Sequence, residues 1–171
     1  MITRVSFKNF KRFSDADVEL GERVVFIGPN NAGKTTSLQA LALWHFGLAS
    51  WVDKKSGKNV SKRTGVALNR RDLIHIPLPE SILLWKNKHV RKSEYLEGKQ
   101  TNENVKIEII VEGTDLGKSW SLGLEFDYAN SESIYCRPIG NFELADEIVE
   151  LLLNTKVAFL QPMSGLAPIE P

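Results

Sequence analysis

The sequence has almost no cysteine, no long apolar run and no large net charge, and each shortage narrows the class of protein. Cys136 is the single cysteine among 171 residues, which excludes a framework of internal disulfides and favours a reducing, cytoplasmic setting. No run of about 18 apolar residues occurs, so we expect no contact with a membrane interior. The first ten residues alternate polar and apolar positions, which argues against a signal peptide.

The rest of the composition is that of an ordinary globular domain. Hydrophobic residues make up 42% of the chain and charged residues 25%, and this length suffices for one domain with a core. The three histidines have no spacing typical of zinc sites. We interpret His45 as a core residue with a hydrogen-bonding partner and Cys136 as inert. Glu125 and Asp127 are interpreted as solvated charges on a strand, not as a catalytic pair.

Charge is distributed unevenly along the chain. The net charge is only +1, but residues 53–92 contain eleven Lys/Arg against three Asp/Glu, whereas residues 93–171 contain five against fourteen. The basic segment contacts the phosphate backbone of DNA, or it is a solvated insertion whose tryptophans pack in the core; the sequence leaves both interpretations open. The candidate nucleic-acid residues are Lys54, Lys55, Lys58, Lys62, Arg63, Arg70 and Arg71.

Hydrophobic periodicity predicts the elements. We expect strands at residues 2–7, 17–20, 23–27, 105–111, 119–128, 133–138 and 156–161, and helices at 34–48 and 142–153. The run 23–27 is apolar and β-branched, which suits a buried strand. Strands 105–111 and 119–128 are expected to form a hairpin. On the first helix, the predicted inward face consists of Leu38, Leu41, Ala42, His45 and Leu48. We predict a loop or a mobile insertion for 54–71, and we assign no element to the mostly polar stretch 86–104.

A glycine-rich loop with the pattern G-x-x-x-x-G-K-[ST] spans residues 28–35, with Gly28, Gly33, Lys34 and Thr35 at the fixed positions. Backbone N–H groups in such a loop wrap around a phosphate, the lysine reaches the β and γ phosphates, and the threonine hydroxyl binds Mg²⁺. Asn31 suits the loop because asparagine tolerates left-handed conformations. An apolar segment precedes the loop and a helix follows it, as the motif requires.

Two stretches together resemble the N-terminal part of the AAA-like, ABC-type ATPases grouped with the SMC, RecF, SbcC and OLD proteins. They are Phe7-Lys8-Asn9-Phe10-Lys11-Arg12-Phe13 and Gly28-Pro29-Asn30-Asn31-Ala32-Gly33-Lys34-Thr35-Thr36. Members of that class open with an Asn-Phe element and a basic residue, followed by a strand and G-x-N-x-x-G-K-[ST]. The likeness is specific over residues 1–48, loose over 105–161, and does not account for 49–104.

The resemblance implies that ATP and Mg²⁺ are the cofactors. It assigns nucleotide binding to Lys11, Gly28, Asn30, Asn31, Ala32, Gly33, Lys34, Thr35 and Thr36. Lys11 matches the basic residue that lies near the phosphates in that class, and Thr35 matches the magnesium ligand. Gln161 resembles the glutamine that holds magnesium and the attacking water, although a glutamine that merely ends a strand is the alternative.

Two motifs of that class are missing. Ser164-Gly165 is not followed by a second glycine, and no run of four apolar residues ends in Asp-Glu. The acidic groups that complete magnesium coordination and polarise water are therefore not visible. The resemblance thus implies an incomplete ATPase head, which needs a C-terminal half or a second head for hydrolysis. For the complete head, the resemblance implies a homo-oligomer in which two heads enclose two ATP molecules.

The sequence predicts a single α/β domain over residues 1–171, a P-loop NTPase core with an adjoining antiparallel β-sheet lobe. Its parts are a strand hairpin, phosphate loop and first helix (1–48), a basic insertion (49–104), a β-rich lobe (105–161) and a tail (162–171). The predicted function is an ATP·Mg-binding part of an SMC/RecF/OLD-like ATPase acting in DNA repair, chromosome maintenance or phage defence. A stand-alone small-molecule kinase and a non-hydrolysing, nucleotide-dependent binding module are the alternatives.

Overall fold

An antiparallel sheet of six strands, in the order β2–β1–β6–β7–β8–β3, forms the body of the molecule. The computed structural model describes residues 1–55, 65–96, 99–140 and 146–155. The strands are β1 (Ile2–Lys8), β2 (Asp15–Glu19), β3 (Val66–Asn69), β4 (Arg91–Leu96), β5 (Lys99–Asn104), β6 (Ile107–Asp115), β7 (Lys118–Asn130) and β8 (Ser133–Pro138). The helices are α1 (Lys34–Lys55) and α2 (Asp146–Asn154), with 3₁₀ turns η1 (Arg70–Asp72), η2 (Ser81–Leu84) and η3 (Lys86–Lys88).

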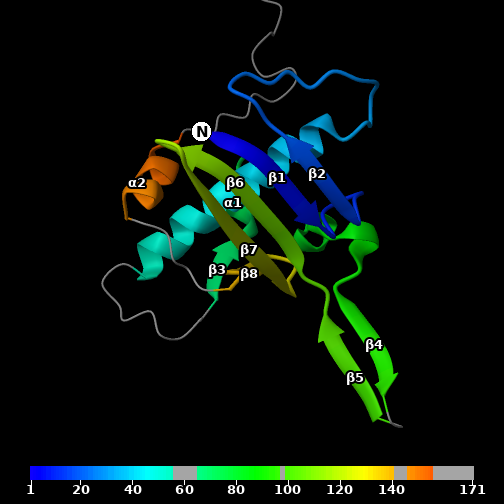
Figure 1. Ribbon diagram of the computed structural model, residues 1–171. Coiled ribbons are helices and arrows are strands. Elements are labelled where there is room, and N and C mark those ends of the chain that lie inside the picture. Colours follow the sequence, from blue (N-terminus) through cyan, green and yellow to red (C-terminus); the bar gives the residue numbers. More distant parts are fainter. Residues whose placement is uncertain (56–64, 97–98, 141–145, 156–171) are drawn as a thin grey trace, which may run out of the picture.

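Helix α1 crosses one face of this sheet, and α2 packs beside it (Figure 1). Gly47 faces the sheet so closely that a Cβ there would lie 2.9 Å from the Cys136 sulfur. The indole of Trp44 donates a hydrogen bond of 3.0 Å to the Leu122 carbonyl. Because a small and a large residue both contact the strands there, the middle of the helix is fixed against the sheet.

The predicted hairpin and third strand are confirmed. Strands β6 and β7 bury every second residue, and β7 pairs with β8 over Ser133–Pro138, the range predicted. The turn is tighter than expected: it is made by Leu116 and Gly117, both with positive φ, instead of residues 113–118. Gly113 lies within β6, and it must be glycine because the Trp120 ring of the neighbouring strand occupies the space that a side chain would need.

Helix α1 is longer than predicted, since it runs on to Lys55 instead of ending at Leu48. Gly47 does not end the helix because it faces the sheet, and Trp51, 5% exposed, continues the buried side. Leu38 was predicted to face inward, but it is 47% exposed. It lies in the first turns of the helix, where it lines a groove together with Leu20, Val24 and Phe26.

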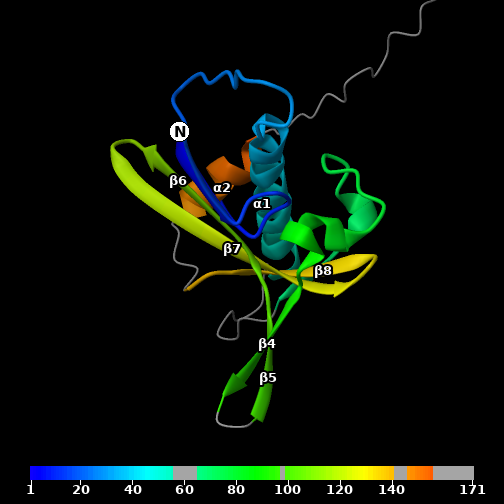
Figure 2. The ribbon, with the colours of Figure 1, turned by 90° about the vertical axis from the view of Figure 1, so that its right-hand side faces the viewer.

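The segment 49–104 contains more regular structure than predicted. Strand β3 adds to the sheet edge by pairing with β8, so the expected loop over 54–71 is wrong for that part. Strands β4 and β5 form a separate hairpin that projects away from the six-stranded sheet (Figures 1 and 2). The hairpin was missed because its sequence is polar and lacks the alternation that a half-buried strand shows.

The predicted strand 23–27 is wrong in this chain. The segment between β2 and α1 runs as a loop outside the sheet (Figures 1 and 2), and Val25 and Ile27 are 81% and 90% exposed. An apolar run becomes a buried strand only when neighbours pair with it and cover it. In the part of the chain that the structure describes, no strand lies along this segment.

The predictions for the C-terminal part can be compared only in part. Helix α2 agrees with residues 146–153 of the predicted helix. Residues 142–145, the predicted strand 156–161 and the tail 162–171 lie outside the described residues. Neither described helix combines the length and the hydropathy needed to cross a membrane.

Candidate nucleotide-binding site

The phosphate loop leads directly into α1, as the motif predicts. The amide of Ala32 donates to the Pro29 carbonyl at 3.3 Å, which closes a tight turn, and Asn31 has a φ of 67°. The side chains of Asn30, Asn31 and Ala32 are exposed. A tight turn with residues in the left-handed region orients successive backbone N–H groups towards one side, which is the geometry of an anion-binding nest.

Only glycine fits at position 33. Its φ is 101°, which other residues rarely adopt. A Cβ there would also lie 2.8 Å from Cε2 of Phe13. Phe13 belongs to the turn between β1 and β2, and its ring packs edge-on against Phe7. The Asn-Phe element and the phosphate loop are therefore in direct contact, although nine residues of loop and one strand separate them in the sequence.

The first turn of α1 completes a hollow suited to a phosphate. The amide of Ser37 donates to the Gly33 carbonyl at 2.9 Å, so the helical hydrogen bonds begin there. The amides before it have no acceptor within the helix and carry its positive dipole end. Residues Asn31, Ala32, Gly33, Lys34, Thr35 and Thr36 line a cavity of about 270 Å³ at this point. The cavity thus combines backbone donors with the predicted binding side chains.

The ammonium of Lys34 lies across the loop. Its Nζ donates to the carbonyls of Gly28 and Pro29, at 2.7 Å each. These carbonyls hold the charge at the loop, where phosphate oxygens can replace them as acceptors. The Thr35 side chain is exposed beside the cavity, so its hydroxyl is open to a metal ion. The residues present therefore fit a magnesium-bound polyphosphate.

Lys11 is held against the same helix. Its backbone is left-handed, with φ 51°, and its Nζ donates to Oε1 of Gln39 at 2.5 Å. Burial lowers the pKa of Lys11. Gln39 follows Thr35 by four residues, so the two lie on the same side of α1. Sequence reasoning missed Gln39, because its burial, with only 7% exposed, and its contact with Lys11 are visible only in the fold.

Other predicted residues do not join this site. The ammonium of Lys54 donates to the Ala67 carbonyl at 2.7 Å, and Arg70 forms a salt bridge with Glu132 at 3.0 Å. Arg71 is 79% exposed and lies 3.7 Å from the same carboxylate. Lys55 ends α1. Lys58, Lys62, Arg63 and Gln161 lie outside the described residues. The interleaved tryptophans, Trp51 and Trp85, are core residues, 5% and 1% exposed.

The interpretation of Glu125 and Asp127 as solvated is wrong. Asp127 is 6% exposed, and Arg137 of β8 donates to both carboxylates. Lys106 adds a salt bridge to Glu125 at 2.9 Å. Burial would raise the pKa of Glu125, but the hydrogen bonds from Arg137 and Lys106 outweigh it and lower the pKa. The two carboxylates are therefore paired with Arg137 and Lys106 in one ion network and are not free in solvent.

The two other single-residue interpretations have mixed outcomes. Nε2 of His45 is buried and has no hydrogen-bond partner among the described residues, so the expected partner is not found. Cys136 is fully buried, and burial raises the pKa of its thiol well above the usual range. A thiol that is protonated and inaccessible is unreactive, which agrees with the prediction.

Comparison with known proteins then decides the family. A family model described as an AAA ATPase domain matches residues 1–152. The chain belongs to the AAA ATPase domain family. This AAA ATPase domain is also 46% identical over 43 residues to an OLD nuclease from Thermus scotoductus. That match covers 25% of this chain and 8% of the relative, so the chain spans only a small part of the relative's length.

Family membership confirms the resemblance to the AAA-like class of SMC, RecF and OLD proteins and implies a nucleotide-binding P-loop fold. One component of an ATPase site is not found. Across residues 1–55, 65–96, 99–140 and 146–155, no three His, Cys, Asp or Glu side chains are grouped so that they could hold a metal ion.

Proposed function

We propose that this AAA ATPase domain binds ATP with Mg²⁺ and supplies the phosphate-binding half of an ATPase site. The observation that carries the proposal is the convergence of the phosphate loop, the amides at the start of α1 and the Lys34 ammonium on one cavity. Charge-assisted hydrogen bonds and helix-terminal amides are what a polyphosphate requires.

Each predicted residue has a role in this proposal. The backbone amides from Asn30 to Thr36 hold the β phosphate, and Gly28 and Gly33 allow the loop to approach it. Lys34 exchanges its loop carbonyls for phosphate oxygens, and the Thr35 hydroxyl binds Mg²⁺. Lys11 adds charge beside the helix, and by the family likeness Gln161 approaches the magnesium and the attacking water.

Hydrolysis requires acidic groups that the sequence does not offer in the expected form. We propose that a C-terminal half or a partner chain supplies the aspartate that completes magnesium coordination and the glutamate that orients water. Two complete heads, in a homo-oligomer, would then enclose two ATP molecules. The chain alone is expected to bind nucleotide and to hydrolyse it poorly.

The biological setting that we propose is DNA repair, chromosome maintenance or phage defence, with DNA as a partner. The support is the class of relatives, one of which bears the name OLD nuclease, together with the basic segment. Of its described members, Arg71 has a side chain that is 79% exposed. A titration with duplex DNA tests this part, since phosphate contacts give an affinity that falls steeply with salt.

The central experiment is a titration of the purified chain with a fluorescent ATP analogue and Mg²⁺. We expect saturable binding, at least tenfold weaker in Lys34→Ala. Lys118→Ala is the matched control, since Lys118 is an exposed lysine in the β6–β7 hairpin and should change nothing. Normal turnover by the isolated chain, abolished by Lys34→Ala, would disprove the half-site. Binding without turnover even beside the completing half would favour the non-hydrolysing module.

A further inference from the structure

Strands β4 and β5 form a two-stranded ribbon that is separate from the six-stranded sheet. The ribbon projects away from the body of the molecule in both views (Figures 1 and 2). The side chains of residues 91–93 and 102–104 are exposed and polar on both faces of the ribbon. Because an isolated ribbon of two strands is only marginally stable in water, a ribbon that stands free of the core is expected to gain stability from a ligand.

The base of the ribbon is held firmly to the Asn-Phe element. The amide of Val105 donates to the Val90 carbonyl at 3.0 Å, and the buried indole of Trp85 donates to the Val105 carbonyl at 2.6 Å. The side-chain amide of Asn9 donates to the Lys106 carbonyl at 2.9 Å. These contacts fix the direction in which the ribbon leaves the body, so it presents its side chains to a ligand in a defined orientation.

One face of the ribbon carries hydrogen-bonding groups and a cation. The register places Arg91 opposite Asn104. It also places Ser93 opposite Asn102, on the same face because the side chains of a strand alternate. The Ser93 hydroxyl donates to Oδ1 of Asn102 at 2.6 Å, which fixes that amide and leaves its Nδ2 group as a donor. Arginine pairs with guanine, and asparagine with adenine, through two hydrogen bonds in the major groove of DNA.

Cations without a carboxylate partner lie where the ribbon begins. Lys88 and Arg91 are exposed, and within the described residues no salt bridge holds either of them. The basic residues of the six-stranded sheet differ, since carboxylates pair with Arg4, Lys8 and Lys106. Lys88 has a φ of 59°, a left-handed conformation that is unfavourable for lysine. A strained backbone that presents an unpaired cation at the foot of the ribbon indicates contact with an anion.

We propose that the β4–β5 ribbon enters the major groove of duplex DNA, with the Arg91 face towards the base edges and Lys88 on a phosphate. The dimensions agree, because strands of six residues are about 20 Å long and lie about 5 Å apart, whereas the groove is about 12 Å wide and about 8.5 Å deep. A two-stranded ribbon is one of the protein elements that this groove admits. The proposal rests on the proposed function, which names DNA as a partner.

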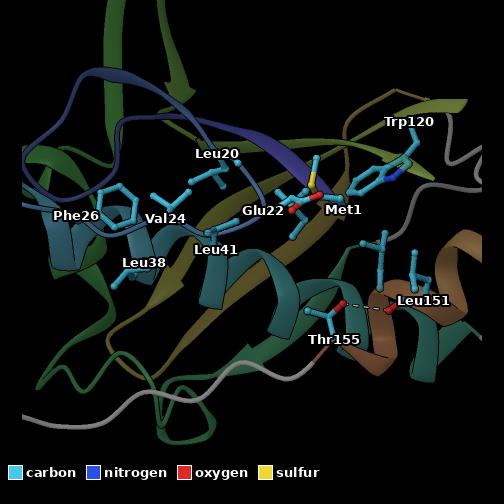
Figure 3. A pocket seen from close by; sticks show the side chains of 13 residues that line it. Met1, Leu20, Glu22, Val24, Phe26, Leu38, Leu41, Trp120, Leu151 and Thr155 are labelled. Atoms are coloured by element: carbon cyan, nitrogen blue, oxygen red, sulfur yellow. Dashed lines mark hydrogen bonds between the residues drawn. The ribbon is translucent and has the colours of Figure 1, made fainter. Parts of the chain in front are cut away.

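Other surfaces of the described chain suit DNA less well. Two of the predicted nucleic-acid residues, Lys54 and Arg70, are bound to a carbonyl and a carboxylate of the chain itself. The edge strand β2 exposes acidic side chains, which repel phosphates. The groove beside α1 that Figure 3 shows is lined mainly by apolar side chains, and Glu22 is the only charged side chain there. The ribbon, by contrast, combines unpaired cations with hydrogen-bonding side chains on an exposed element.

Fluorescence anisotropy with a short labelled DNA duplex tests the two cations. We expect Lys88→Ala and Arg91→Ala each to weaken binding at least fivefold, and Lys88→Ala to lower the salt dependence by about one released counterion. Lys118→Ala is the matched control, because it removes the same charge from the exposed β6–β7 hairpin and should leave the affinity unchanged. Unchanged affinity in both ribbon variants would overturn the proposal. Absence of DNA binding by the unsubstituted chain would also overturn it, in favour of a protein strand as the partner.

Cross-linking tests which groove the ribbon enters. Asn102→Cys places a thiol on the proposed base-reading face, while the native Cys136 is buried. The duplex carries an activated disulfide tether on cytosine N4, in the major groove, or on guanine N2, in the minor groove. We expect Asn102→Cys to react at least tenfold faster with the major-groove tether than with the other. It should also react at least tenfold faster than Leu116→Cys, at a turn that is 97% exposed. Equal rates in either comparison would overturn the proposal.

These measurements can fail separately from the proposed function. Lys88, Arg91 and Asn102 do not line the phosphate cavity, so their variants should bind the fluorescent ATP analogue as the unsubstituted chain does. That result also shows that each variant is folded. DNA binding that no ribbon variant alters would overturn the ribbon and keep DNA as a partner. Cross-linking to the major-groove tether by a chain that binds no ATP analogue would refute the ATP site and keep the ribbon.

Discussion

Gly33→Ala is expected to destabilise the chain for two separable reasons. The first is the φ of 101°, which costs a residue with a Cβ about 1–2 kcal/mol. The second is overlap, since the new Cβ would lie 2.8 Å from Phe13 Cε2, and overpacking of this kind costs about 1–3 kcal/mol. The sum is a loss of about 2–5 kcal/mol in the free energy of unfolding.

Two further variants isolate these contributions. Gly117→Ala is the control for backbone strain alone, because Gly117 has a φ of 80° and nothing within 4 Å of its Cβ position; we expect a loss of about 1–2 kcal/mol. Phe13→Ala removes the overlapping ring and costs about 2 kcal/mol, less than the 3–5 typical of a fully buried phenylalanine. In the double variant, the cost of Gly33→Ala should fall to that of the control.

Urea unfolding followed by tryptophan fluorescence measures the stability of the unsubstituted chain and of the four variants. The expected coupling between the Gly33 and Phe13 substitutions is about 1–3 kcal/mol, well beyond the ~0.5 kcal/mol within which independent sites add. Additive costs, or a cost of Gly33→Ala equal to that of Gly117→Ala, would refute the contact between the Asn-Phe element and the phosphate loop.

Three further results are expected. Gln39→Ala should weaken binding of the ATP analogue about three- to tenfold, because Lys11 loses the acceptor that holds it beside α1, and Gln39→Glu should retain it. Glu125→Gln should cost about 2 kcal/mol at pH 7, where Arg137 pairs with the carboxylate. Because the pKa of Glu125 is lowered in the folded state, this stabilisation is present above the unfolded-state pKa and is lost as the pH falls through the folded-state pKa. Urea unfolding at pH 3 should therefore show a much smaller difference between the variant and the unsubstituted chain. Cys136 should resist alkylation until the chain unfolds in urea, and rapid native labelling would contradict its burial.

The sequence predicted those elements whose pattern is local. The alternation in β6, β7 and β8 depends on one buried face, and the phosphate loop depends on glycine and lysine at fixed spacing. Both can be recognised without knowledge of the partners in space. The limits of α1 were less certain, because Gly47 is a helix-ending residue by propensity and a contact residue in the folded chain.

The missed features depend on residues distant in sequence. Periodicity shows that residues 23–27 are apolar, but it does not show that no strand of the described chain pairs with them. Glu125 and Asp127 alternate as solvated charges do, and only the register between β7 and β8 places Arg137 beside them. Gln39 acquires its role from Lys11, 28 residues earlier. Each case needed a pairing in space that one strand or helix pattern cannot reveal.

The anchoring of α1 has a consequence for movement. A helix of 22 residues is about 33 Å long, and here Trp44 and Gly47 fix it to the sheet midway. Arrival of a ligand at its first turn therefore cannot tilt it without breaking the core. Any response must be taken up by the loop that precedes the helix, in which residues 23–27 form no backbone hydrogen bond with the rest of the described chain.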